Sequence, residues 1–441
     1  MRIVLISTYD LGRQPFGLAS PAAWLRDRGH HVTCADLSVG SLPSLEVREA
    51  DMVALYLPMH TATRMAAGII RNVRSLNPRA RLCCYGLYAP LNQDYLREIG
   101  VETVIGGEFE LELAKVASGI PHSIQSSVSL DRLSFVTPDR VGLPVLGRYP
   151  RLVCNGTRRI VGATEASRGC KHLCRHCPIV PVYNGVFRVV PADVVLEDIR
   201  QQVAAGAEHI TFGDPDFFNG PGHARRIVEA LHQEFPQLSY DVTIKIEHLL
   251  RHKEYLPVLE RTGCLFITTA VESIEDSVLE KLDKGHTRAD FFDAVRITRE
   301  QGLALTPTFL PFTPWTTREG YLELLAAIAE LDLIDAVAPV QLALRLLIPA
   351  GSRLLELPDI QAVIGDYDKL SLAYPWRHPD PEIDALASSV MNIVREDTRD
   401  RRTRRATFQR IWEHVHSRPL PEHDVLLPRT VIPYMEEPWF C

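Results

Sequence analysis

Hydrophobic and polar positions follow two alternating patterns over the first 118 residues. Short runs of consecutive apolar residues, typical of strands buried on both faces, are separated by stretches with an apolar residue every three or four positions, typical of amphipathic helices. The predicted strands are 2–7, 31–35, 52–57, 81–85 and 102–105, and the predicted helices are 18–28, 60–75 and 91–99. This alternation predicts a doubly wound, Rossmann-like parallel sheet, in which ligands bind at the carboxyl ends of the strands.

A second strand–helix series occupies residues 164–350. Its predicted strands are 162–166, 209–212, 239–246, 264–271, 304–310 and 340–347, and the predicted helices are 192–205, 223–234, 256–262, 277–282, 289–300 and 319–330. The series predicts a partial (β/α)6 barrel, whose catalytic residues would lie at the carboxyl ends of its strands. Residues 119–163 contain four prolines and are interpreted as a linker, and residues 351–441 as a helical C-terminal region with a proline-rich tail.

Composition narrows the class of protein. The chain is 46% hydrophobic and 23% charged, as in ordinary globular proteins, and its net charge of −7 gives no general attraction to nucleic acid or anionic membranes. No apolar run approaches the roughly 20 residues that span a bilayer, and the first apolar run is too short for a signal peptide. We therefore expect a cytoplasmic protein with no membrane or nucleic-acid partner. The odd number of cysteines, nine, indicates metal or redox chemistry rather than a disulfide framework.

The strongest chemical signal is a loop with three cysteines. Cys170, Cys174 and Cys177 have the spacing C-x3-C-x2-C and follow the predicted strand 162–166. Three thiolates on one short loop can ligate three irons of a cubane cluster and leave the fourth iron open. Two alternatives stay open: a zinc site with His172 or His176 as fourth ligand, and a redox pair formed by Cys174 and Cys177.

The loop and the barrel around it resemble the radical S-adenosylmethionine superfamily over about residues 160–350. The resemblance implies a 4Fe–4S cluster on the three cysteines, S-adenosylmethionine bound to the open iron, and reductive cleavage of one of its carbon–sulfur bonds. It also implies an electron donor such as flavodoxin or ferredoxin and a substrate that the sequence does not identify. The alternative is a non-catalytic iron–sulfur or zinc-binding regulatory protein on the same fold.

Two further segments carry the resemblance. Gly213-Asp214-Pro215-Asp216 follows the second predicted barrel strand, in the place of the family's glycine–glycine–glutamate motif, which holds the amino group of the cofactor. Asp214 and Asp216 are therefore candidate ligands, and the alternative is a turn with a capping aspartate. The pair Glu272-Ser273 ends another predicted strand, and the resemblance implies that it lies near the ribose and carboxylate of the cofactor.

Lys245 and Glu247 lie in the predicted strand 239–246 or directly after it. Strand alternation would place both side chains on one face. If that face points into the barrel, they are buried charges and catalytic candidates; if it points outward, they are solvated and have no special role.

The first 118 residues resemble the cobalamin-binding domain that precedes many radical enzymes of this kind. The match is strongest at residues 101–110, whereas the histidine signature D-x-H-x-x-G is replaced by Asp10-Leu11-Gly12-Arg13. The resemblance implies either cobalamin bound without a protein imidazole, with methyl transfer to an unactivated carbon or a phosphinate, or a degenerate domain kept for packing or substrate binding.

The last residue, Cys441, follows Trp439-Phe440. Nearly the whole chain resembles a narrower family of radical enzymes in which Trp-Phe-Cys is followed by cysteine or selenocysteine and then Ala-Glu-Pro. This implies that the encoded protein continues past Cys441 as a member of a selenoprotein family and makes Cys441 a catalytic candidate. The alternative is a natural end with one unpaired thiol.

Overall fold

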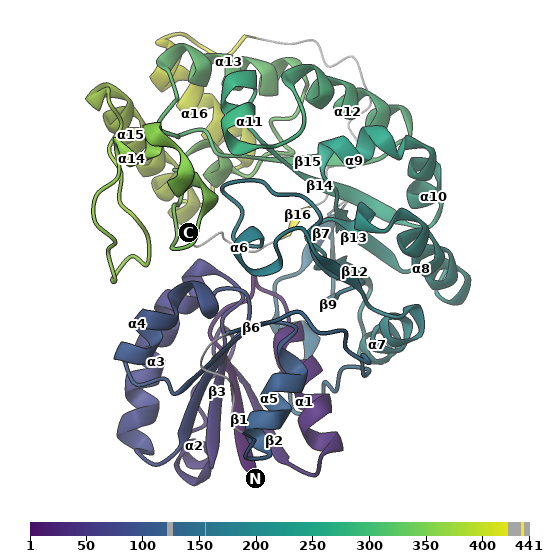
Figure 1. Ribbon diagram of the computed structural model, residues 1–441. Coiled ribbons are helices and arrows are strands. Elements are labelled where there is room, and N and C mark those ends of the chain that lie inside the picture. Colours follow the sequence, from purple (N-terminus) through teal and green to yellow (C-terminus); the bar gives the residue numbers. More distant parts are fainter. Residues whose placement is uncertain (121–126, 155, 422–433, 436–441) are drawn as a thin grey trace.

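The computed structural model describes residues 1–120, 127–154, 156–421 and 434–435 and has two α/β lobes (Figure 1). The N-terminal lobe, purple to blue in the figure, contains one sheet with helices on both faces. The second lobe, teal to green, contains a second sheet whose helices lie on its outer side. The short helix α6 (Val180–Tyr183) lies between the two lobes.

The first sheet is parallel, with strand order β2-β1-β3-β4-β5-β6. Its strands are β1 (Arg2–Ser7), β2 (His31–Asp36), β3 (Met52–Tyr56), β4 (Arg81–Tyr85), β5 (Thr103–Gly107) and β6 (Val128–Ser129). This is the doubly wound 2-1-3-4-5 order, in which the chain reverses direction across the sheet between β1 and β3. The carboxyl ends of β1 and β3 therefore mark the expected ligand site, and the predicted Rossmann-like fold is confirmed.

Both faces of this sheet are buried, which explains its uninterrupted apolar strands. Ile3 and Leu5 face one core, against α1 and α5, whereas Val4 and Ile6 face the other, against α2, α3 and α4. The helices are α1 (Phe16–Asp27), α2 (Ser44–Glu49), α3 (His60–Leu76), α4 (Gln93–Glu98) and α5 (Phe109–Ala117). The sequence pattern did not predict α2 and α5.

The second sheet has five parallel strands in the order β15-β14-β13-β12-β9. They are β9 (Val161–Thr164), β12 (His209–Phe212), β13 (Ser239–Thr243), β14 (Cys264–Glu272) and β15 (Ala304–Phe309). The predicted sixth strand, 340–347, is instead a 3-10 turn (Pro339–Leu342) followed by a single bridge between Phe312 and Arg345. The sixth position of the partial barrel is thus occupied by irregular chain, since the 3-10 turn takes up the first half of the predicted strand.

Helices cover the outer side of this sheet and form the largest apolar core of the protein, with Ile210, Tyr240, Ile267 and Phe309 contributed by the strands. The helices are α7 (Ala192–Ala204), α8 (Pro221–Glu234), α10 (Leu256–Arg261), α11 (Asp276–Leu282), α12 (Arg288–Glu300) and α13 (Arg318–Glu330). The C-terminal region adds α15 (Pro381–Arg399) and α16 (Arg404–His416), as the pattern predicted.

Two connections join the lobes on opposite sides. Arg140, in the predicted linker, contacts Gln14 of the first lobe at 2.6 Å and Asp198 of the second at 2.7 Å. On the other side, residues 364–376 reach the first lobe, where Lys369 pairs with Glu98 at 2.7 Å. The lobes are therefore fixed relative to one another by polar contacts.

A small antiparallel sheet has the order β16-β7-β8, with β7 (Leu152–Cys154), β8 (Thr157–Arg159) and β16 (Tyr434–Met435). Met435 packs against a small core that contains Leu152 and Phe266. Among the residues that the structure describes, no helix is long and apolar enough to cross a membrane.

Candidate active site

The three-cysteine loop begins directly after β10 (Ser167–Gly169), which pairs antiparallel with β11 (Phe187–Val189). Gly169 has a φ of 71°, and a Cβ there would lie 2.4 Å from the carbonyl oxygen of Val186 and 2.5 Å from the ring of Tyr183. Only glycine tolerates this backbone and this approach. The glycine therefore sets the point at which the chain turns from the strand into the loop.

The loop keeps the three thiols close together and shielded from solvent. Cys174 is buried, and Cys170 and Cys177 are half-buried. Burial raises the pKa of Cys170 to about 11 and that of Cys177 to about 12, and the neighbouring thiols add to the shift. Burial therefore opposes ionisation of Cys170 and Cys177, and a bound metal ion would be needed to stabilise their thiolates.

The spacing of the thiols discriminates between a cluster and a single ion. Within the described residues, the only three His, Cys, Asp or Glu side chains whose donor atoms lie within 4.8 Å of one another are His172, Asp216 and His248. At least one pair of the three sulfur atoms therefore lies more than 4.8 Å apart, which is wider than the roughly 4 Å expected when thiolates share one zinc at about 2.3 Å. A cubane, in which each thiolate binds a different iron, fits this wider spacing.

The two loop histidines are directed to other partners. His172 Nε2 lies 3.1 Å from His248 Nε2, and His176 Nε2 lies 3.1 Å from Glu272 Oε1. Neither arrangement supports the alternative of a Cys3His zinc site.

The C-terminal half of the chain holds the loop from its outer side. Arg175 Nη1 donates to the carbonyl oxygens of Glu280 and Lys281 at 3.0 and 2.9 Å. Arg353 Nη1 donates to the carbonyl of Leu173 at 2.9 Å, and Ser352 Oγ donates to that of Arg175 at 3.2 Å. These contacts orient the loop toward the barrel.

Glu272 ends β14 at a bulge, with a φ of 68°, and is buried. Burial alone would raise its pKa, but Lys284, whose Nζ lies 3.4 Å away, and His176 lower it to about 2. Glu272 is thus an ionised carboxylate directly beside the cysteine loop. Ser273 Oγ accepts from the backbone N–H of Glu275 at 3.0 Å and closes the following turn.

The segment Gly213 to Asp216 follows β12 at the same edge of the sheet. Asp214 accepts from the backbone N–H of Ala166 at 2.9 Å and from Ser167 Oγ at 2.5 Å, while burial raises its pKa to about 6. Asp216 accepts from the backbone N–H of Phe218 at 3.1 Å, and its other oxygen lies 2.7 Å from His248 Nδ1. Both aspartates therefore already have intramolecular partners.

The predicted strand through Lys245 and Glu247 is wrong. β13 ends at Thr243, Lys245 is the N-cap of α9 (Ile246–Arg251), and Glu247 lies in the first turn of that helix. Lys245 is 9% exposed, and its Nζ lies 3.5 Å from Glu247 Oε2, which in turn lies 3.5 Å from His172 Nδ1. The two charges do lie beside the cysteine loop, but a strand-to-helix junction places them there.

Arg168, the residue before Gly169, connects the two lobes. Its guanidinium is buried and donates to Glu110 of α5 at 2.6 and 2.9 Å and to Glu165 at 2.8 Å, with Glu108 at 3.4 Å. Sequence analysis missed this residue and Lys284, and it considered His176 only as a possible zinc ligand. The only sequence signal of Arg168 was its position two residues before the first cysteine of the loop.

A cavity of about 320 Å³ lies between the lobes, at the switch point of the first sheet. Its walls include Asp10 and Leu11 after β1, Met59 after β3, and Glu165 and Gly213 from the second lobe. Burial raises the pKa values of Asp10 and Glu165 to about 7. No histidine belongs to the described residues that line this cavity, so the lining offers no imidazole to a metal ion.

Cys441, the third catalytic candidate from the sequence, lies outside the described residues.

The site is thus a three-thiol loop at the carboxyl edge of a parallel β/α sheet, facing a second α/β lobe. Residues 164–326 match the family model of the Radical SAM superfamily, and the chain therefore contains a radical SAM domain.

The curated relatives include methylases, methylthiotransferases and a cyclase. The chain is 25% identical over 324 residues to the hopanoid C-3 methylase of Methylococcus capsulatus, covering 68% of this chain and 62% of the relative. It is 23% identical over 189 residues to the ribosomal protein uS12 methylthiotransferase RimO of Parabacteroides distasonis, covering 40% and 42%. The chain therefore spans less than two thirds of the length of these relatives.

Two solved structures share the two-lobed architecture. OxsB, a cobalamin-dependent S-adenosylmethionine radical enzyme with aqua-cobalamin and S-adenosylmethionine bound, superposes with a TM-score of 0.69 at 14% identity, covering 90% of this chain and 67% of OxsB. TsrM from Kitasatospora setae, a radical S-adenosylmethionine methyltransferase with tryptophan and aza-SAM bound, gives 0.64 at 16% identity, covering 88% and 89%. These likenesses establish the fold, including the predicted N-terminal sheet and partial barrel.

Proposed function

We propose that this protein is a radical S-adenosylmethionine enzyme that modifies a substrate still to be identified. The observation that carries the proposal is the set of three thiols, Cys170, Cys174 and Cys177, buried or half-buried on one loop that follows the strands of the second lobe, within the residues that match the Radical SAM superfamily. A 4Fe–4S cluster on these thiols would supply the electron that cleaves S-adenosylmethionine. The protein's own task is to hold the cofactor and to exclude water.

The ionised carboxylate of Glu272 is the group that we assign to the cofactor's ribose, because a carboxylate at a strand end accepts hydrogen bonds from ribose hydroxyls. Lys284 and His176 hold it ionised, and the turn closed by Ser273 fixes its position. For the cofactor's amino group we retain the segment from Gly213 to Asp216 rather than one carboxylate, since Asp214 and one oxygen of Asp216 already accept hydrogen bonds.

We further propose that the N-terminal lobe binds cobalamin and that the reaction is a methyl transfer. The cavity at the β1/β3 switch point supports this, as do relatives and structural neighbours that are methylases or carry cobalamin. Because no histidine lines the described cavity, the cobalt should have no axial imidazole from the protein. Electron paramagnetic resonance of the cobalt(II) form tests this, since protein-derived nitrogen splitting would contradict it. Failure to bind cobalamin would favour the degenerate domain.

Two finer assignments complete the proposal. We propose flavodoxin or ferredoxin as the electron donor, because the cluster needs a one-electron reductant. We also propose membership of the narrower Cys-Cys or Cys-selenocysteine tail family, on the motifs around Asp10, Tyr88 and Trp315 and on the ending Trp439-Phe440-Cys441. A nucleotide sequence with a UAA or UAG stop directly after codon 441 would contradict the second assignment.

The experiment that tests the function is anaerobic reconstitution with iron and sulfide, followed by reduction with dithionite in the presence of S-adenosylmethionine. We expect absorbance of an iron–sulfur cluster and cleavage of the cofactor. 5′-Deoxyadenosine would indicate hydrogen abstraction, whereas S-adenosylhomocysteine would indicate methyl transfer. A protein that holds a full cluster but leaves the cofactor intact would support the non-catalytic alternative, and one equivalent of zinc on the thiols would support the zinc alternative.

A further inference from the structure

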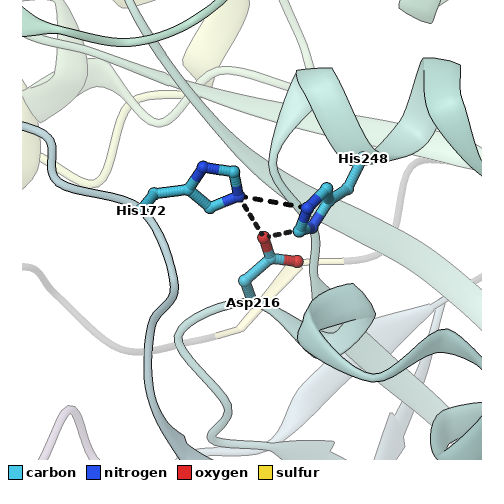
Figure 2. A group of neighbouring side chains, drawn as sticks. All are labelled: His172, Asp216 and His248. Carbon is cyan, nitrogen blue, oxygen red and sulfur yellow. Dashed lines mark hydrogen bonds and ion pairs between the residues drawn. The ribbon is translucent and has the colours of Figure 1, made fainter. Parts of the chain in front are cut away.

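Three side chains of types that bind metal ions lie close together beside the three cysteines, and none of them is a proposed cluster ligand. His172 comes from the cysteine loop, Asp216 from the segment after β12, and His248 from α9 (Figure 2). One donor atom of each lies within 4.8 Å of the others. Asp216 is 1% exposed and His248 0%, whereas the side chain of His172 is 12% exposed. The group is therefore almost closed to bulk water.

The contacts within this group form a row. They run from Glu247 Oε2 to His172 Nδ1 (3.5 Å), from His172 Nε2 to His248 Nε2 (3.1 Å), and from His248 Nδ1 to Asp216 Oδ2 (2.7 Å). Of these three contacts, only the one between the two histidines is a hydrogen bond, and the two contacts with carboxylates are ion pairs.

Two buried polar atoms of this group lack a hydrogen-bond partner. Asp216 Oδ2 and His248 Nδ1 are both buried and have no hydrogen-bond partner, although they lie 2.7 Å apart, because the N–H direction does not meet the oxygen. A buried polar atom without a partner is costly, and two that face the same space indicate an absent ligand. His172 Nε2 lies 3.7 Å from the same carboxylate oxygen.

We propose that His172, Asp216 and His248 bind one divalent transition-metal ion of the Zn²⁺ or Fe²⁺ type, separate from the iron–sulfur cluster. Ligands about 2.0–2.2 Å from one ion lie roughly 3.0–3.5 Å apart. Asp216 Oδ2 lies 2.7 Å from His248 Nδ1 and 3.7 Å from His172 Nε2, on either side of that range, and one ligand atom of each of the three residues lies within 4.8 Å of the others. Two imidazoles and one carboxylate form the donor set of catalytic zinc and non-haem iron(II) sites, which keep further positions for water or substrate.

The surroundings fit a metal-bound histidine. When Nε2 of His172 binds the ion, its Nδ1–H points at Glu247, which is the carboxylate–histidine–metal arrangement that fixes tautomer and ring orientation. Glu247 is itself held by Arg251 at 2.7 Å and by Lys245 at 3.5 Å. Because His172 lies between Cys170 and Cys174, the ion would also fasten the cysteine loop to α9 and to the segment after β12.

The test separates this ion from cluster iron. In a variant with all three loop cysteines changed to alanine, we titrate Co²⁺ anaerobically, record its d–d absorption, and displace it with Zn²⁺. We expect one equivalent of Co²⁺ in a nitrogen–oxygen environment. His172→Ala, His248→Ala and Asp216→Asn, each in this background, should weaken binding at least tenfold. The matched control is His176→Ala, a histidine of the same loop that faces Glu272, and it should leave the affinity within twofold.

Several outcomes would overturn the proposal. One is a natively folded triple-cysteine variant, checked by circular dichroism, that binds no Co²⁺; another is an affinity that His248→Ala leaves unchanged. Protonation of three of the four ring nitrogens of His172 and His248 without metal, seen by nitrogen NMR, would assign the contact between His248 and Asp216 to a proton rather than to a metal ion. If the triple variant does not fold, the cluster-loaded protein is exposed to Zn²⁺ and its zinc content compared with that of His248→Ala. Equal zinc in the two would refute the site, whichever group the thiols hold.

Discussion

In the variant Arg168→Met, the contact between the two lobes should be lost at a lower urea concentration than the fold of either lobe. The guanidinium is buried and forms ion pairs with Glu110, Glu165 and Glu108 at 2.6, 2.8 and 3.4 Å. Methionine fills a similar volume but leaves three carboxylates without their cation. Burial already raises the pKa of Glu108, and that of Glu165 to about 7, against the attraction of Arg168.

The magnitude follows from the kind of interaction that is removed. Breaking a buried ion pair by deleting one partner costs about 3–5 kcal/mol, because the remaining charge stays buried. We therefore expect Arg168→Met to lose about 4 kcal/mol from the first urea transition, read by circular dichroism, a large part of the total stability of a typical domain. Glu110→Gln added to Arg168→Met should restore part of the loss, since it removes one of the stranded charges.

Arg200 provides the matched control. It also contacts two carboxylates, Glu234 at 2.7 Å and Glu197 at 2.8 Å, but its side chain is 41% exposed. Arg200→Met should leave the urea midpoint unchanged within error, because water screens exposed pairs. If Arg168→Met unfolds within 1 kcal/mol of the parent protein, burial of the Arg168 cluster does not hold the lobes together and the reasoning fails.

Three further outcomes follow from the site. Alanine should abolish cluster iron at each of the loop cysteines but not at buried Cys264, as measured by iron content after reconstitution; full iron in any loop variant would exclude that ligand. Glu272→Ala should weaken S-adenosylmethionine binding by about 1–3 kcal/mol in calorimetry, the cost of an unpaired polar group, and unchanged affinity with an intact cluster would reject the role. Burial raises the pKa values of Asp10 and Glu165 to about 7 in the folded protein, so between about pH 4 and pH 7 these groups bind more protons in the folded protein than in the unfolded chain. The free energy of unfolding in urea should thus fall as the pH rises from about 4 to 7, by about 1–2 kcal/mol per group after solvent screening in the cavity. Asp10→Asn should make this pH dependence weaker, and a parent protein whose free energy of unfolding does not change over this pH range would contradict the prediction.

Periodicity predicted the two sheets because their strands are buried on one or both faces over whole elements. The predictions failed where tertiary contacts override local pattern. Ile244 and Ile246 continue the apolar alternation of β13, yet the chain turns into α9 at Lys245, since both side chains are buried equally well at the start of a helix. Residues 340–347 are apolar enough for a strand but pair with the sheet only at Arg345.

The three cysteines could be singled out as candidate ligands from their spacing because they lie on one short loop, whereas the 4Fe–4S assignment itself is implied by the family resemblance and stays a prediction. Glu272 could be predicted only through a family resemblance. Arg168 and Lys284 could not be predicted, since their partners lie 58 and 12 residues away and no local pattern reports a buried ion pair. The roles of His172 and His176 also depend on direction: four positions apart in one loop, they face Asp216 and Glu272 on opposite sides.

Separate parts of the chain fix the cysteine loop. Arg168 ties its beginning to α5 of the first lobe, and Arg353 of the C-terminal region holds the carbonyl of Leu173. Within the barrel, His176 meets the end of β14, and His172 meets α9. The inter-lobe cavity is therefore joined to Cys170, the first proposed cluster ligand, through two covalent neighbours, because Arg168 and Gly169 both line that cavity and directly precede Cys170. If a ligand in the cavity repositions Glu165 or Arg168, the electronic environment of the cluster should change. The reduction potential of the cluster, measured with and without that ligand, would therefore report the coupling between the two lobes.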